Sequence, residues 1–309
     1  MGLLVVKRIL LGIGTLIPVF FNLIDFYYTY NKIDFWKNYT IDVGPWCEKS
    51  KNIGFMKEKI NANSSFIFLW ISLYLYYKSY RLRYYNFKNN ILHHLPLVGY
   101  MYTFINLIHW FGSFLNHSCS CTIGHRINLI GLYMLVTFWF PYYWFRYQFF
   151  KNKNPYVKAL SIKNKDIVYK GFILWIMTIN MALFPITNYN YKNELSELTE
   201  LGVVVFTFII CLILDYETKQ ICKNKSISIN YNVNSKCILI TITTIGLGIV
   251  TRKLDIYKIY CYNNSIILVH VFWHVFLSIS TLLIFNDAVN EKMQLMNMLP
   301  LVNTGETFY

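Results

Sequence analysis

Hydrophobic residues along this chain are grouped in blocks about as long as the hydrocarbon core of a membrane. A helix that crosses this core of about 30 Å needs roughly 20 mostly apolar residues. Blocks of about this length cover residues 9–29, 64–80, 96–115, 127–145, 167–187, 199–216, 236–251 and 265–285. The pattern predicts an all-α polytopic membrane protein: a bundle of seven transmembrane helices preceded by one N-terminal hydrophobic segment.

The order of the blocks divides the chain into four parts. Residues 1–30 are a signal anchor or signal peptide, and residues 31–63 are a lumenal segment. Residues 64–290 form a seven-transmembrane domain, and residues 291–309 are a cytosolic tail. In the first part Lys7 and Arg8 precede an apolar run that Asp25 interrupts. No small-residue cleavage site follows the run, which favours a retained anchor over a cleaved peptide.

The composition supports a membrane protein. Of 309 residues, 55% are hydrophobic and only 14% are charged, whereas a soluble domain carries roughly 25% charged residues. These values argue against a soluble enzyme and against a disordered chain. The net charge of +14 has a simple cause, because membrane proteins concentrate Lys and Arg in cytoplasmic loops. No basic stretch has the context of a nucleic-acid reader, so we expect no nucleic-acid partner.

Basic residues follow alternate blocks and thereby predict the orientation. Residues 81–88, 146–165 and 219–225 are rich in Lys and Arg, with Arg146 counted in the second loop, whereas residues 117–126 and 188–198 are poor in them. The positive-inside rule then places the rich loops and the C-terminus in the cytosol. We expect an integral membrane protein of the endoplasmic reticulum or the Golgi.

Three histidines are candidates for a metal site. His270 and His274 are four residues apart in the last block, and Ser113 and His117 have the same spacing in the second block of the bundle. Residues at this spacing share one face of a helix. The predicted orientation places all three histidines at one lumenal depth. Three imidazoles around an open position form a catalytic zinc site; alternatively, each histidine bonds a backbone carbonyl at the membrane interface.

The other histidines have simpler interpretations. His109 lies two turns deeper than His117 and is expected to be a packed core residue. His93 and His94, in a cytosolic loop, and His125, in a lumenal loop, are expected to be solvated.

Acidic and polar residues precede the first block of the bundle. Glu58, Asn61 and Ser64 recur at helical spacing. Glu48 and Glu58 offer hard oxygen ligands for a calcium-type site. Acidic residues in a lumenal loop are more often simply solvated, so this signal is weak by itself.

Taken together, these residues resemble the alkaline ceramidase family, within the seven-transmembrane hydrolase superfamily that also includes the adiponectin-type receptors. The sequence PWCE at residues 45–48 resembles the family's Asp-Trp-Cys-Glu, and EKINANS at 58–64 resembles Glu-x-x-Asn-Thr-x-Ser. SFLNH at 113–117 and HVFWH at 270–274 resemble Ser-x-x-x-His and His-x-x-Trp-His. From about residue 135 to 262 the similarity is in hydropathy alone, and the first 40 residues lie outside it.

The resemblance implies a zinc-dependent hydrolase of sphingolipid metabolism. His117, His270 and His274 would hold zinc, with Ser113 beside it. The implied reaction is hydrolysis of the amide of ceramide, a membrane lipid, to a sphingoid base and a free fatty acid. A calcium site is implied as well, at Trp46, Glu48, Ser50 and Glu58.

Two departures from the family leave other functions open. Asn128 stands where the family has an Asp near the zinc, and an amide cannot accept a proton as a general base does. Pro45 replaces the Asp of the calcium site. The alternatives are a hydrolase of another lipid, such as a GPI-remodelling acyl hydrolase, and a catalytically impaired lipid sensor or receptor that keeps zinc for structure.

Four cysteines are predicted to face the lumen, where disulfides persist. We expect Cys47 to pair with Cys261, although Cys119 or Cys121 could also supply a partner. Asn38-Tyr-Thr is a glycosylation sequon in the predicted lumenal segment.

Overall fold

The structure is a computed structural model that describes most of the chain. The described residues are 3–38, 47–84, 92, 95–151, 169–178, 194–224, 227–229, 234–259, 261, 269–291 and 293–295.

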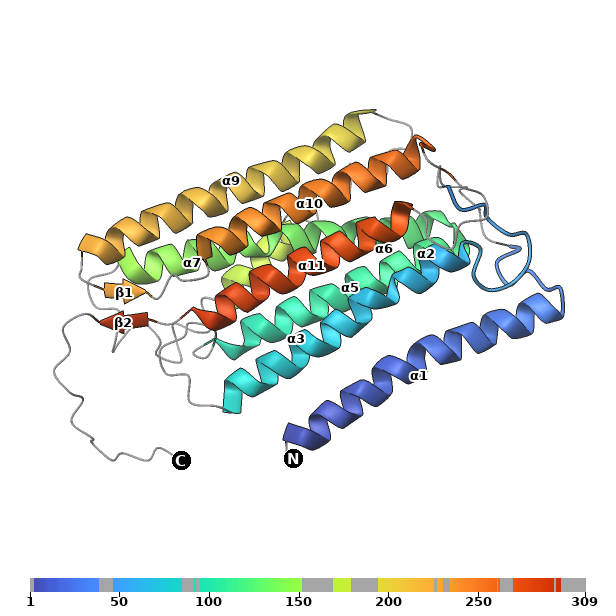
Figure 1. Cartoon of the computed structure of the whole chain (residues 1–309), viewed down its shortest axis with the longest axis horizontal. Helices are drawn as coiled ribbons and strands as arrows, with labels where there is room; N and C mark the ends of the chain where they lie inside the picture. Colours follow the sequence, from blue (N-terminus) through green and yellow to red (C-terminus); the bar gives the residue numbers. More distant parts are fainter. Residues whose placement is uncertain are drawn as a thin grey trace.

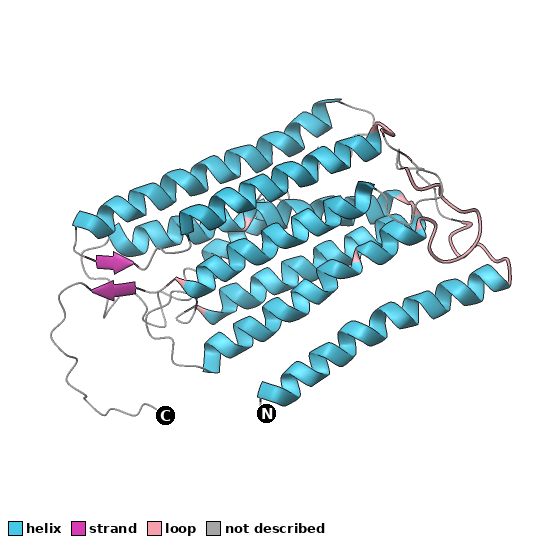
Figure 2. Cartoon of the chain, viewed as in Figure 1, coloured by secondary structure: helices cyan, strands magenta, loops and turns pink. Residues whose placement is uncertain are grey.

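Almost all of the described chain is helical, as predicted (Figure 2). The helices are α1 (Leu3–Tyr30), α2 (Lys59–Ser64), α3 (Phe66–Tyr84), α5 (Pro96–Cys119), α6 (Thr122–Thr137), α7 (Trp139–Lys151), α9 (Glu194–Asn224), α10 (Asn234–Ile256) and α11 (Val269–Asn290). Residues 169–178 are helical too. The long helices lie side by side along one direction (Figure 1). Each apolar block of the sequence overlaps a helical segment, and the block 127–145 overlaps both α6 and α7.

Three helices among the described residues are long and apolar enough to cross a membrane. They are α1, the stretch Thr122–Lys151 that comprises α6 and α7, and α11. This finding is consistent with a membrane protein.

Helix α1 continues through Asp25, the charged residue that interrupts the apolar run of this segment. Asp25 is 2% exposed. Its Oδ1 accepts the backbone N–H groups of Phe55 (3.1 Å) and Met56 (2.8 Å), and its Oδ2 lies 3.0 Å from Lys59 Nζ. A buried charge is tolerated when it is paired and hydrogen-bonded, and here the pairing attaches α1 to the segment before α2.

Helices α5 and α6 pack backbone to backbone. A Cβ atom on Gly112 would lie 2.5 Å from the backbone nitrogen of Asn128, and one on Gly131 would lie 2.5 Å from the Cα of His109. Any larger residue at these positions would push the helices apart, as in the small-residue contacts of membrane helices. The close contact fixes the face of α5 that carries Ser113 and His117.

The described core between the helices is apolar and rich in aromatic rings. The ring of Tyr102 on α5 stacks on Phe285 of α11 at 5.8 Å and contacts Phe138 at 4.9 Å. Aromatic side chains bury large areas at fixed geometry, so this layer holds α5 and α11 together below the histidines.

A charged cluster is buried where α7, α9 and the end of α11 meet. Arg146 was expected in a cytosolic loop, but α7 continues to Lys151 and leaves Arg146 only 1% exposed. Its Nη1 donates to Asp215 Oδ1 (2.8 Å) and its Nε to Glu291 Oε1 (2.7 Å), while Lys219 Nζ lies 2.6 Å from Asp215 Oδ2. The two carboxylates compensate the charge of the buried guanidinium. Arg146 is therefore a buried residue of the bundle and not part of a loop, contrary to the expectation from the sequence.

A short ribbon joins two connections that the sequence does not predict to meet. Strand β1 (Ile227–Ile229) pairs antiparallel with β2 (Met293–Leu295). The start of the predicted tail is therefore attached to the connection between α9 and α10. Strands of three residues are too short to show the alternation that identifies a strand in a sequence.

Candidate metal centre

His117, His270 and His274 come together in the structure, as predicted. His117 lies in the last turn of α5, and His270 and His274 lie in the first two turns of α11. All three are buried, with exposed fractions of 1%, 2% and 1%. One candidate ligand atom from each lies within 4.8 Å of the other two. This group can hold a metal ion.

The outer ring nitrogens show how the rings are oriented. His117 Nδ1 lies 2.7 Å from Glu58 Oε2, and His270 Nδ1 lies 3.1 Å from Asp255 Oδ2. The Glu58 carboxylate accepts the hydrogen bond from His117, so we assign the proton of that neutral ring to Nδ1. His270 Nδ1 and Asp255 Oδ2 are within ion-pair distance but do not have hydrogen-bond geometry. His117 Nε2 is then unprotonated and faces His270 Nε2.

His274 follows the same rule with a hydroxyl partner. Its Nδ1 lies 2.7 Å from Ser64 Oγ, and that hydroxyl donates to the carbonyl oxygen of Asn61 (2.8 Å). The Ser64 oxygen therefore accepts from Nδ1. Ser113 Oγ lies 3.2 Å from His274 Nε2, which places the predicted catalytic serine at the inner side of the ring.

The donor set fits a divalent metal ion. His117 Nε2 and His270 Nε2 are 3.1 Å apart, within hydrogen-bond distance when one ring is protonated at Nε2. Two neutral rings that both carry the proton on Nδ1 would instead direct two lone pairs at a shared cation. In a tetrahedral zinc site with Zn–N bonds of about 2.0–2.1 Å, neighbouring ligand nitrogens are about 3.3 Å apart. The spacing of this pair is close to that value, and all three candidate ligand atoms lie within 4.8 Å of one another.

A backbone hydrogen bond to α5 holds Glu58 in place. Its N–H donates to the carbonyl oxygen of His117 (2.9 Å), next to a similar bond from Lys57 to Ser118 (2.9 Å). These bonds lay the segment before α2 along the end of α5. The Glu58 carboxylate therefore reaches His117, a contact that the calcium prediction did not include.

Glu48 anchors the start of α2. Its two carboxylate oxygens accept the N–H groups of Ile60 and Asn61, both at 2.8 Å, and negative charge is favourable at a helix N-terminus. Burial raises the pKa of Glu48 above its usual value, and the two N–H bonds oppose this shift. Trp46 lies outside the described residues and Ser50 lies in the loop after Glu48, so the calcium site stays a prediction.

Two disulfides lie around the histidines. Cys47 pairs with Cys261, as predicted, and Cys119 pairs with Cys121. The backbone N–H of Cys47 donates to Asp255 Oδ1 at 3.1 Å. The first disulfide thus joins the segment that contains Glu48 to the connection before α11, and the Cys47 backbone joins the same segment to Asp255, which lies next to His270.

Among the described residues, no hydrogen bond links Asn128 to the three histidines. It lies on α6 against Gly112 of α5, and its side-chain oxygen is buried with no hydrogen-bond partner among those residues. A direct role for Asn128 stays a prediction.

Of the remaining described histidines, His109 is buried as expected and His125 is buried contrary to expectation. His125 is 8% exposed in the first turn of α6, so the expectation that it is solvated is wrong. His109 is buried against the ring of Phe68 at 4.6 Å, as expected of a core residue. His93 and His94 lie outside the described residues.

Asp255 is the site residue that the sequence interpretation missed. It is fully buried at the end of α10. A signal was available: Asp255 follows the block 236–251 at its predicted lumenal end, six residues before Cys261. An acid at the predicted depth of the histidines, close to a predicted disulfide, is a candidate partner for one of them.

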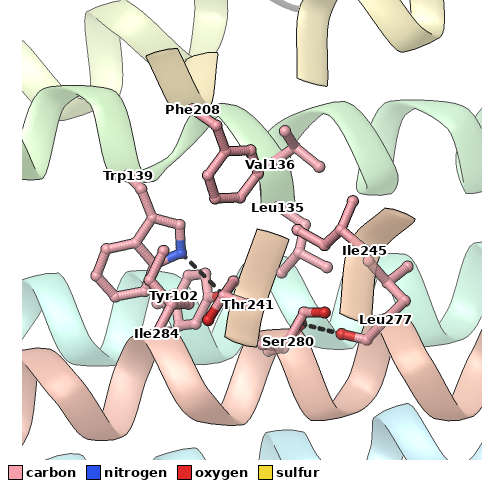
Figure 3. Close-up of a pocket in the computed structure, with 11 residues that line it drawn as sticks. Tyr102, Leu135, Val136, Trp139, Phe208, Thr241, Ile245, Leu277, Ser280 and Ile284 are labelled. Carbon is pink, nitrogen blue, oxygen red and sulfur yellow. Dashed lines mark hydrogen bonds between the residues drawn. The ribbon is translucent and has the colours of Figure 1, made fainter. Parts of the chain in front are cut away.

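A small cavity lies deeper along α11, beyond the histidines (Figure 3). Its volume is about 20 Å³, which accommodates about one water molecule and not a lipid chain. Trp139 Nε1 donates to the Tyr102 hydroxyl at 3.1 Å, and Ser280 Oγ lies 2.7 Å from Thr244 Oγ1. The lining residues are Tyr102, Leu135, Val136, Trp139, Phe208, Thr241, Ile245, Leu277, Ser280, Thr281 and Ile284.

Comparisons with protein-family models, with curated proteins and with solved structures found no match to this chain. Fold and site together define a helical protein of membrane-spanning character with a buried three-histidine centre that can hold a metal ion.

Proposed function

We propose that this chain is a zinc-dependent membrane amidase that hydrolyses ceramide to a sphingoid base and a free fatty acid. The observation that carries the proposal is the convergence of one ring nitrogen from each of three buried histidines, whose rings lie against Glu58, Asp255 and Ser64 on their outer side. The ordered resemblance of the four sequence motifs to the alkaline ceramidase family selects the substrate.

The residues of the site have different roles in the proposed reaction. His117, His270 and His274 would hold the zinc ion, which when bound would supply Lewis-acid chemistry for the substrate carbonyl and for a water molecule. The Ser113 hydroxyl, 3.2 Å from His274 Nε2, is in position to donate a hydrogen bond to the amide oxygen as charge develops on it. Asn128 cannot take a proton. Because a positioned base contributes about 10²–10⁴-fold, we expect a slow enzyme.

We further propose seven transmembrane helices after a retained N-terminal helix, with the histidine centre on the lumenal side and the C-terminus in the cytosol. The basic loops support this orientation. The disulfides support it independently, because both lie at the histidine end of the bundle and disulfides form in the oxidising lumen of the secretory pathway. The endoplasmic reticulum and the Golgi both satisfy this condition. Calcium, if bound at Trp46, Glu48, Ser50 and Glu58, would be connected to the zinc site through Glu58.

The test combines metal analysis with product release. Purified protein should contain one equivalent of zinc and release sphingoid base from ceramides, and a chelator should stop the release. His274→Ala should lose both zinc and activity. The matched control is His109→Gln, which alters a buried histidine of α5 outside the cluster and should keep the zinc. Absence of bound metal, or hydrolysis unchanged in His274→Ala, would contradict the zinc mechanism.

Asn128 favours a second candidate, a lipid sensor or receptor that keeps the metal for structure. In that case the wild type binds zinc and lipid but releases no product, and Asn128→Asp creates activity. A substrate panel that includes acylated GPI lipids separates the ceramidase from a GPI-remodelling hydrolase.

A further inference from the structure

A groove of about 290 Å³ lies between the N-terminal half of α1 and the first two thirds of α3. It begins at Trp70, two residues after the Phe68 ring that contacts His274, and extends to Tyr77, away from the histidine centre. Leu10 and Leu11 of α1 form one wall, and Trp70 and Leu73 of α3 form the other. Figure 1 shows α1 as the outermost helix on the α3 side of the bundle. In a membrane this groove faces lipid, because the outer face of α1 is apolar and exposed.

One end of the groove is polar and positively charged. Lys7, Tyr74 and Tyr77 complete its lining. Lys78 adds a second ammonium group, 5.4 Å from the centre of the Tyr74 ring.

No carboxylate neutralises this end within the described residues. Helix α3 contains no acidic residue, and the single acid of α1, Asp25, is paired with Lys59 at the other end of the helix. Among the described residues neither Lys7 nor Lys78 forms an ion pair. The rim therefore offers two ammonium groups and two phenol hydroxyls to an anion.

We propose that the groove between α1 and α3 binds an anionic phospholipid of the cytosolic leaflet. Its acyl chains would lie against the leucines and Trp70, and its phosphate would lie between Lys7, Lys78 and the tyrosine hydroxyls. Basic pockets between transmembrane helices on the cytoplasmic side bind anionic head groups in this way. The choice of leaflet rests on the orientation proposed above, whereas the binding does not depend on the hydrolytic activity.

The test counts the lipid that stays with the full chain. Protein is reconstituted in nanodiscs of phosphatidylcholine with a minor share of phosphatidylserine, extracted into mild detergent and analysed by native mass spectrometry. We expect phosphatidylserine to be retained selectively. Lys7→Gln and Lys78→Gln should each reduce phosphatidylserine retention roughly fivefold, the equivalent of about 1 kcal/mol per basic residue. Lys7→Arg, which keeps the positive charge, should retain the lipid like the wild type. Leu11→Trp should reduce it by filling the apolar part.

The matched control is Arg8→Gln, which removes the same charge from the next residue, outside the groove lining. Retention should be unchanged in this variant. An equal loss in Arg8→Gln and Lys7→Gln would mean diffuse attraction to an anionic surface and would overturn the proposal. So would equal retention of phosphatidylcholine, displacement of the lipid by inorganic phosphate, or an intact mass that lacks residues 1–30, since α1 forms one side of the groove.

Discussion

Each candidate ligand of the metal centre has one contact on the outer side of its ring. Glu58 and Asp255 offer carboxyl groups, whereas Ser64 offers a neutral hydroxyl that already donates to Asn61. A carboxylate next to a ligating histidine raises the basicity of the ring and fixes its tautomer. His117 and His270 should therefore be stronger ligands than His274.

We expect Asp255→Asn to weaken zinc binding about 10–100-fold, the usual effect of removing such an outer contact. The amide cannot hold a negative charge against His270, although it keeps the shape of the side chain. Competition with a chromogenic chelator measures the change directly. Glu217→Gln, an exposed acid on α9, is the control and should bind zinc like the wild type. Unchanged affinity in Asp255→Asn would show that Asp255 does not orient a ligand.

At the scale of elements, short segments between the helices build most of the outer contacts. Helix α2 supplies Ser64 and follows Glu58, and its N-terminus is held by the Glu48 carboxylate. The Cys47–Cys261 disulfide joins this segment to the connection before α11. The backbone of Cys47 also holds Asp255, so the disulfide restrains contacts to His117 and to His270 together.

Reduction of this disulfide, or Cys47→Ser, should therefore lower both thermal stability and zinc affinity. The loss of a native disulfide costs about 2–5 kcal/mol in small secreted domains. Thermal unfolding and chelator competition measure the two effects, and a mobility shift on non-reducing gels reports the bond. Cys222→Ser, far along α9, serves as the control. If zinc affinity stays constant while stability falls, the disulfide braces the fold without orienting the ligands.

The helices were predicted from local signals, because apolar blocks of helical length are visible in any short window. The three-histidine group also required the predicted orientation of the blocks, since His117 and His270 are 153 residues apart. The contact of Asp255 with Cys47 spans 208 residues and requires the packed bundle. Arg146 was misplaced for a related reason, because a cation at the end of an apolar block is typical of a loop. In the structure its charge is compensated by Asp215 and Glu291, which lie far from it in the sequence.

At the scale of the whole molecule, α11 connects two buried polar centres across an aromatic core. The histidines lie at its start, and Glu291 follows its end within the Arg146 cluster. The 21 positions from His270 to Glu291 correspond to about 30 Å at 1.5 Å per residue. The packed rings of Tyr102 and Phe285 lie between the two centres. This arrangement suggests that the cluster stabilises the bundle without contributing to the metal site.

Arg146→Ala tests this separation. The variant leaves Asp215 and Glu291 buried without their shared cation, and removing one partner of a buried ion pair costs about 3–5 kcal/mol. Lys219→Ala should cost much less, about 0–1 kcal/mol, because its ammonium group is partly exposed. Denaturant or thermal unfolding of the purified protein gives both values. The folded fraction of Arg146→Ala should bind zinc with wild-type affinity, since about 30 Å of packed helix lies between the cluster and the histidines. A parallel fall in zinc affinity in that fraction would instead show that α11 couples the two ends, and the metal centre would then depend on the whole length of the bundle.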